Sequence, residues 1–188
     1  MSLSVAVTAD TQRAVERFYA YEARLLDERQ YQQWLALLSE SISYIVPARV
    51  NAAVDNRQRG NESMLAVANE LERADGEGCP LREESYIHLM LRVERAYKPN
   101  SWSENPPART RRLVANIEVM EATEDSFTIW SHFHLHYARP GSRSCLYSGQ
   151  RKDVIVISAD TDAGFKLAGR EVILDYADIE LPTVGLLF

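Results

Sequence analysis

Three of the four histidines in this chain alternate along one short stretch, as His132-x-His134-x-His136. Imidazole is a common ligand for Zn, Cu and Fe, so the run could hold a metal ion. On one face of a strand, however, neighbouring side chains lie about 7 Å apart and the outer pair about 13 Å apart, so only two could share a metal. Further ligands would have to come from elsewhere, and the remaining histidine, His88, lies on a predicted helix. We therefore favour a polar sheet face whose histidines hydrogen-bond water or a partner.

A glutamate occupies an apolar position in the first predicted helix. Glu22 lies on the apolar stripe, seven residues after Val15. A carboxyl group there could be an acid or base of raised pKa that faces an internal pocket. Together with Tyr44 and His88, it would form the acid–base set of a stand-alone dehydratase or isomerase. The alternative is that Glu22 pairs with an arginine across the core, and this is the interpretation we favour.

A cluster of arginines, Arg109, Arg111 and Arg112, follows the segment Trp102-Ser-Glu-Asn-Pro-Pro. Guanidinium groups bind oxyanions in forks, so a phosphate or carboxylate ligand is one interpretation. The chain has 27 Asp and Glu against 21 Lys and Arg. This excess of acids favours the other interpretation, in which the arginines pair with carboxylates of this chain or of a partner subunit.

Several motifs that carry chemistry are absent from the sequence. Cys79 and Cys145 lie 66 residues apart, and neither has a histidine within two positions, so the ligand pattern of a Rieske iron–sulfur centre is missing. The sequence also contains no H-E-x-x-H, P-loop, G-x-G-x-x-G or G-x-S-x-G motif, which are common zinc, nucleotide and acyl-transfer signatures. We therefore expect no catalytic, cofactor-binding or metal-binding residue in this chain.

The composition is that of an ordinary globular domain. The chain has 188 residues, of which 46% are hydrophobic and 26% charged, and we expect residues 1–188 to form a single domain. The net charge of −6 argues against general nucleic-acid binding, which depends on Lys and Arg. No signal peptide and no apolar run of about 18 residues is evident, and the sparse cysteines fit a reducing cytoplasm, where we expect the protein to act.

Helical periodicity dominates the first half of the sequence. Apolar side chains at three-four spacing predict a helix after an N-cap at Asp10 or Thr11, and a second helix capped by Asp27. A strand that is an edge or that ends at Pro47 is expected over Ser41–Val50. A polar loop follows, with a weak helical patch at Met64–Leu71. The next helix is expected over Tyr86–Tyr97.

The second half alternates with period two. Four strands with turn residues between them are expected to pair as antiparallel neighbours: Arg109–Ala122, Ser126–Arg139, Ser144–Ser158 and Phe165–Ile179. Helices first and strands later, without βαβ alternation, predict an α+β fold. In this fold a curved antiparallel sheet holds helices against one face.

Spaced motifs along most of the chain resemble one family. FYAYEARLLDERQYQQWLALLSESISYIVPAR resembles the N-terminal signature of the small (β) subunits of bacterial aromatic-ring-hydroxylating dioxygenases. LRVERAYKPNSWSENPPARTRRLVANIEV resembles their second signature, and YSGQRKDVIVI with FKLAGREVILD resembles their paired C-terminal strands. The match runs from about Phe18 to Asp175. Tryptophan followed by Ser-Glu-Asn-Pro is especially similar to members that act on biphenyl- and benzene-type hydrocarbons.

This resemblance implies a fold and an assembly. The implied fold is a cone-shaped curved sheet with helices, shared with scytalone dehydratase and ketosteroid isomerase. Three β subunits would join three large α subunits in a hexamer that receives electrons from a ferredoxin and a reductase. The α subunit would carry the Rieske iron–sulfur cluster and the mononuclear iron, and the β subunit would be mainly structural. The complex would add dioxygen to an aromatic hydrocarbon and give a cis-dihydrodiol.

The same resemblance suggests where the subunits meet. We expect subunit contacts from six residues of the second signature: Trp102, Glu104, Asn105, Arg109, Arg111 and Arg112. Two segments depart from the family pattern, the turn Tyr137-Ala-Arg-Pro-Gly and the terminal Thr-Val-Gly-Leu-Leu-Phe. The histidine run is not part of that pattern, and a subunit interface is one hypothesis for it. The other hypotheses for the chain are a stand-alone dehydratase or isomerase of the cone fold and a small metalloprotein.

Overall fold

A computed structural model describes residues 6–54, 57, 59–72, 78–102, 104–178, 181–183 and 185–188. The helices are α1 (Ala9–Asp27), α2 (Tyr31–Ala36) and α3 (Tyr86–Ala96). The main sheet contains β1 (Leu38–Val46), β4 (Arg82–Glu84), β5 (Arg109–Ala122), β6 (Ser126–Ala138), β7 (Cys145–Ile157) and β8 (Phe165–Leu174). A separate two-stranded ladder pairs β2 (Ala48–Arg49) with β3 (Leu71–Glu72).

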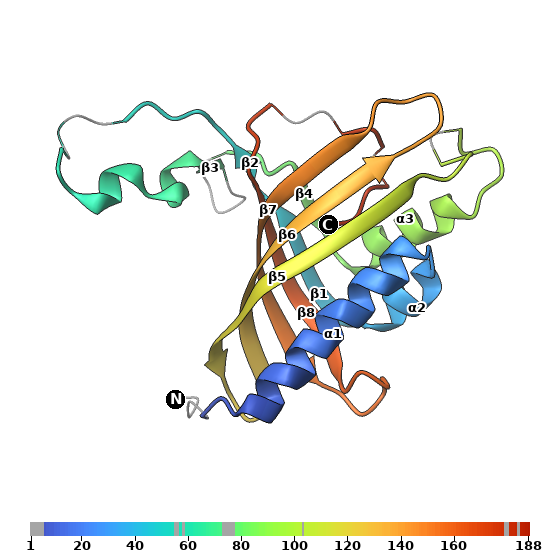
Figure 1. Cartoon of the computed structure of the whole chain (residues 1–188), viewed down its shortest axis with the longest axis horizontal. Coiled ribbons are helices and arrows are strands. Elements are labelled where there is room, and N and C mark those ends of the chain that lie inside the picture. The colour runs from blue at the N-terminus through green and yellow to red at the C-terminus, as the bar shows by residue number, and fades with distance from the viewer. Residues whose placement is uncertain are drawn as a thin grey trace.

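The main sheet has the order β4-β1-β8-β7-β6-β5 and curves around the helices, which lie on one side of it (Figure 1). Strands β5 to β8 pair as antiparallel neighbours, as their connecting turns predict. Strand β1 runs parallel to β8, which the long stretch of chain between the two strands permits. The α+β prediction is confirmed, with a mixed rather than a purely antiparallel sheet.

Strand β6 illustrates how the sheet is built. Its burial alternates from residue to residue, with Phe133 and Leu135 on the buried face and His132, His134 and His136 on the exposed face. The buried face belongs to the same hydrophobic core as the apolar side chains of α1 and α3, so the period-two pattern in the sequence sets which face forms the core.

The caps of the first two helices differ from the prediction. The N-cap of α1 is Thr8, whose hydroxyl accepts a hydrogen bond from the Thr11 backbone N–H at 3.1 Å. Asp27 does not cap α2: it is the last residue of α1, and Gln30 precedes α2. Between them Arg29 adopts a left-handed backbone conformation with φ of 60°, as is common directly after the last turn of a helix. Asp27 is free of a capping role because its carboxylate binds β5, as described below.

Some strand boundaries also differ. Strand β1 begins at Leu38, before the predicted start, and ends directly before Pro47, which has no N–H to continue the ladder. It lies between β4 and β8, so it is not an edge strand. The helical patch near Met64 forms two short 3₁₀ turns, Glu62–Leu65 and Val67–Glu70. Strand β8 ends at Leu174, and the predicted end at Ile179 lies outside the described residues.

In the described part of the chain, no helix is long and apolar enough to cross a membrane.

Candidate functional site

The interior of the curved sheet contains a buried ion-pair network centred on Arg170 of β8. Its guanidinium donates to Glu22 of α1 at 2.8 and 3.0 Å and to Asp153 of β7 at 3.0 and 2.8 Å. All three residues are at most 2% exposed. Glu22 therefore pairs with an arginine across the core, and this favoured interpretation of the sequence is confirmed.

The network fixes the charge of the Glu22 carboxyl group. Burial alone would raise its pKa, but the guanidinium groups of Arg170 and Arg151 together lower that pKa to about 2. The Trp34 indole N–H adds a hydrogen bond to the same carboxylate at 3.1 Å. Glu22 is therefore a permanent anion near neutral pH, so it lacks the raised pKa of a buried general acid.

A second arginine completes the network with fewer partners. Arg151 lies 3.5 Å from Glu22 and stacks over the Phe133 ring, with its guanidinium carbon 4.9 Å from the ring centroid. Its Nε and Nη2 atoms, and the Oγ of Ser131 on the adjacent strand, are buried without a hydrogen-bond partner among the described residues. Such groups in a protein interior commonly bind ordered water.

The C-terminal segment of the chain fills the space beside this network. Three successive backbone carbonyls, those of Leu186, Leu187 and Phe188, each accept a hydrogen bond from a different arginine. The donors are Arg82 of β4 at 2.6 Å, Arg112 of β5 at 2.7 Å and Arg170 of β8 at 3.1 Å. We call residues 185–188 the tail; its end lies between the sheet and α3 (Figure 1).

The last side chain of the tail is fully buried. The Phe188 ring packs against Phe133 and Tyr147, with centroid distances of 6.0 and 5.8 Å. The Tyr44 hydroxyl accepts a hydrogen bond from the Phe188 backbone N–H at 3.0 Å and donates one to the Phe188 carbonyl oxygen at 3.1 Å. The tail thus occupies the interior that a ligand of a cone-fold enzyme would need.

The proposed acid–base set does not converge on a pocket. Glu22 is held by arginines, and Tyr44 is bound to the tail. His88 is exposed at the start of α3, where its Nδ1 accepts from the Ser85 backbone N–H at 3.1 Å and caps the helix. The arrangement gives no support to a stand-alone dehydratase or isomerase.

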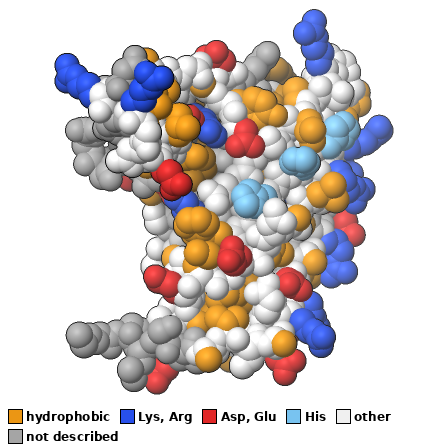
Figure 2. Space-filling model, turned by 60° about the vertical axis from the view of Figure 1, so that its left-hand side comes forward, with side chains coloured by type: hydrophobic (Ala, Val, Ile, Leu, Met, Phe, Trp, Pro, Cys, Tyr) orange, Lys and Arg blue, Asp and Glu red, His pale blue; other side chains and the backbone are white. Residues whose placement is uncertain are grey.

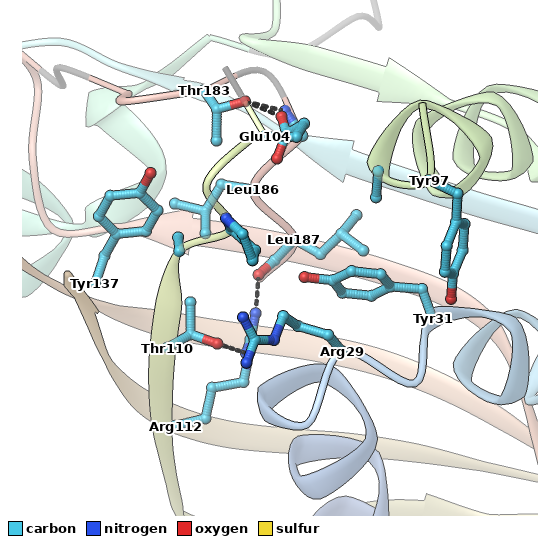
Figure 3. Close-up of a pocket in the computed structure, with 14 residues that line it drawn as sticks. Arg29, Tyr31, Tyr97, Glu104, Thr110, Arg112, Tyr137, Thr183, Leu186 and Leu187 are labelled. Atoms are coloured by element: carbon cyan, nitrogen blue, oxygen red, sulfur yellow. Dashed lines mark hydrogen bonds between the residues drawn. The ribbon is translucent and has the colours of Figure 1, made fainter. Parts of the chain in front are cut away.

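A smaller pocket of about 220 Å³ remains at the mouth of the cone (Figure 3). Its wall is aromatic and aliphatic, formed by Tyr31, Tyr97, Tyr137, Leu186 and Leu187. Its polar groups come from four segments and include Arg29, Glu104, Thr110, Arg112 and Thr183. The tail therefore forms one side of this pocket, and the second sequence signature forms another.

Arg112 joins the tail to the corner between α1 and α2. Its guanidinium and its backbone N–H both bind the Asp27 carboxylate, the backbone bond being 2.8 Å, and Thr110 donates to the same carboxylate at 3.0 Å. Arg112 is only 7% exposed, and this burial lowers the pKa of its guanidinium group. The Asp27 carboxylate acts in the opposite direction and raises that pKa, but burial has the larger effect. The prediction that the arginine cluster pairs with carboxylates is confirmed for Arg112, whereas Arg109 and Arg111 are exposed.

The loop that carries the second signature is held from two sides. Arg139, at the end of β6, donates to the backbone carbonyls of Trp102, Asn105 and Pro106, the last two at 3.1 Å. On the other side, Glu104 accepts a 2.5 Å hydrogen bond from the hydroxyl of Thr183. We call residues 101–102 and 104–107 the mouth loop; its Trp102 is 79% exposed.

The histidine run lies on the outer face of the sheet (Figure 2). The residues opposite His134 are Leu113 and Ser148, and those opposite His136 are Arg111 and Leu146. The described residues contain no group of three or more His, Cys, Asp or Glu side chains placed to hold a metal ion. The sheet neighbours thus do not supply the further ligands that the run would need.

Sequence reasoning singled out Arg112 but missed the other two tail-binding arginines, Arg82 and Arg170, and also Arg139. Arg139 lies in the turn that departs from the family pattern, but nothing in the sequence predicts that it binds the mouth loop. Arg82 and Arg170 gave no signal either, since each acts on backbone carbonyls of a segment more than 15 residues away.

Comparison with known proteins decides the family. The profile described as "Ring hydroxylating beta subunit" matches residues 21–180, which is most of the chain. The chain belongs to the ring-hydroxylating β-subunit family. This membership confirms the resemblance inferred from the sequence motifs.

Curated relatives of this β subunit agree with the profile. It is 29% identical over 183 residues to the β subunit of benzene 1,2-dioxygenase from Pseudomonas putida strain F1, covering 97% of this chain and 91% of the relative. It is also 29% identical over 174 residues to the β subunit of biphenyl 2,3-dioxygenase from Rhodococcus jostii RHA1, covering 92% and 86%. The predicted similarity to benzene- and biphenyl-type members is therefore confirmed.

A solved structure supports the cone fold. A chain of naphthalene 1,2-dioxygenase, determined with indole bound in the active site, superposes with a TM-score of 0.76 at 22% identity, covering 97% of this chain and 88% of that one. The side chains described in this β subunit do not match the ligands of an iron centre. Cys79 is exposed and Cys145 half-buried, and neither belongs to a metal-ligating cluster within the described ranges.

Proposed function

We propose that this chain is the non-catalytic structural subunit of a multicomponent dioxygenase that adds dioxygen to an aromatic hydrocarbon and gives a cis-dihydrodiol. The observation that carries this proposal is the filled cone: three arginines and Tyr44 bind the chain's own tail where a cone-fold enzyme would bind substrate. The Rieske cluster and the mononuclear iron then belong to the α subunit. The relatives named above favour a benzene- or biphenyl-type substrate.

The proposed complex contains three α and three β subunits in the cytoplasm and receives electrons from a ferredoxin and a reductase. Within it, residues 1–188 act as one domain. The mouth loop and the start of β5 contact the α subunit through Trp102, Glu104, Asn105, Arg109 and Arg111. Arg112 contributes from inside, because it links the tail to Asp27 and so supports that surface.

Expression with and without the cognate α subunit tests this proposal. Produced alone, the chain should be colourless, contain no stoichiometric iron and show no ring-oxidising activity. Produced with the α subunit, it should co-purify in a complex of the mass expected for three copies of each chain. Stoichiometric iron together with ring oxidation from this chain alone would overturn the proposal, as would the absence of any complex with the α subunit.

A further inference from the structure

A shallow groove of about 510 Å³ runs beside the mouth loop, between the exposed side of α3 and the turn that follows it. Leu91, Arg92 and Arg95 of α3 form one side. Lys98 and Trp102 lie on the other side, and Ser101 lines it with a buried Oγ that has no hydrogen-bond partner among the described residues. This groove is separate from the pocket at the cone mouth.

The groove carries positive charge in an acidic protein. Its lining includes Arg92, Arg95 and Lys98 and no acidic residue, although the chain has a net charge of −6. Arg92 is partly compensated, because it binds the buried carboxylate of Glu84. Lys98 forms no ion pair with a described residue. A binding partner for this surface would therefore present carboxylates.

The groove also offers apolar side chains on a backbone that is held in place. Leu91 is 52% exposed and Trp102 79% exposed. The backbone that carries Trp102 is held by Arg139, so little backbone entropy remains to be lost when a partner covers the indole ring. Tryptophan side chains on such preorganised surfaces often dominate the energy of an interface.

We propose that this groove is the docking site for an acidic segment of the α subunit, which lays an apolar side chain against Trp102 and places a carboxylate beside Lys98. The inference rests on the proposed function and extends it, since it assigns the chemistry of the partner surface. The choice of the α subunit follows from continuity: Trp102 belongs to both the groove and the mouth loop that contacts the α subunit in the proposed complex.

Affinity measurements with matched variants test the groove. The substitutions are Trp102→Ala and Lys98→Glu; the controls are Leu65→Ala, in the first 3₁₀ turn, and Arg13→Glu, on the exposed side of α1. The dissociation constant for the cognate α subunit is measured at 50, 150 and 500 mM NaCl. Trp102→Ala should weaken binding by about 30-fold or more at every salt concentration. Lys98→Glu should weaken it by about tenfold at 50 mM and much less at 500 mM.

The outcomes separate this inference from the proposed function. Circular dichroism should be the same for all four variants, because the altered side chains are at least about one-third exposed. If the unmodified chain binds the α subunit and both groove variants bind equally well, the groove inference is wrong and the proposed function stands. If the groove variants instead disrupt only self-association of this chain, the occupant is a second copy and the inference is also wrong. If the unmodified chain binds no α subunit, the proposed function itself fails.

Discussion

Glu22 is a buried carboxylate of the ion-pair network centred on Arg170. Its carboxylate binds Arg170, Arg151 and Trp34 while being 1% exposed. Removing one member of a buried ion pair leaves the other charge unpaired, which typically costs about 3–5 kcal/mol. The ionised Glu22 carboxylate therefore stabilises the interior of the cone through its arginine partners, and it is not arranged to transfer a proton.

This charge predicts how stability depends on pH. The pKa of the Glu22 carboxyl group is about 2 in the folded chain, below the value of about 4.3 that a glutamate has when unfolded. A lowered folded-state pKa means that the stabilisation is fully present above about pH 4.5 and is lost as the pH falls toward 2. The expected loss from this one group is on the order of 3 kcal/mol in the free energy of unfolding.

Urea denaturation at several values between pH 7 and 2 measures this loss. The variant Glu22→Gln lacks the titrating group, so its free energy of unfolding should be lower at pH 7 and should fall less steeply below pH 5. Glu16→Gln, on the exposed side of the same helix, should keep the steep dependence of the unmodified chain. Parallel curves for Glu22→Gln and the unmodified chain below pH 5 would contradict the assignment.

At the scale of elements, the sequence predicted the strands whose boundaries follow from local periodicity. The predicted strand Arg109–Ala122 coincides with β5. Strand β6 differs from its prediction by one residue at its C-terminal end, and β7 by one residue at each end, because apolar and polar side chains alternate over many residues. The parallel pairing of β1 with β8 and the seating of the tail could not be predicted in this way. Both depend on contacts between segments that are distant in the chain, and no turn or period marks them.

The tail predicts a measurable contribution to stability. Phe188 is fully buried against Phe133 and Tyr147, so Phe188→Ala removes a core aromatic ring and leaves a cavity. The expected cost is about 3–5 kcal/mol in the free energy of unfolding. An apolar cavity of that kind can bind benzene, so saturating benzene should raise the melting temperature of the variant.

Two comparisons make this result specific to the tail. Phe188→Leu retains much of the apolar volume and should cost clearly less than Phe188→Ala, with little response to benzene. The unmodified chain should not respond to benzene, because its own ring occupies the site. A loss below about 1 kcal/mol for Phe188→Ala would mean that the tail does not stabilise the cone.

At the scale of the whole molecule, the two faces of the sheet have different roles. The inner face is covered by helices and filled by the tail, and its polar groups are largely paired. The outer face exposes the histidine run together with Leu113, Trp130 and Leu146. Surfaces that mix exposed apolar side chains with hydrogen-bonding groups are suited to contact with other subunits. The outer face is therefore more consistent with assembly than with metal chemistry.

This difference predicts that divalent metals leave the chain unaffected. Two neighbouring histidines of the run could supply at most two ligands to one metal ion. The residues opposite His134 are Leu113 and Ser148, which add no strong metal ligand. A zinc site with a dissociation constant of 1 μM would, at ~100 μM zinc, stabilise the chain by about 2.7 kcal/mol and raise its melting temperature by about 5–10 °C. We expect shifts below about 1 °C, both with zinc and after treatment with a chelator. A larger rise that His134→Gln abolishes would show that the outer face binds metal after all, whereas a rise that persists in His134→Gln would arise elsewhere in the chain.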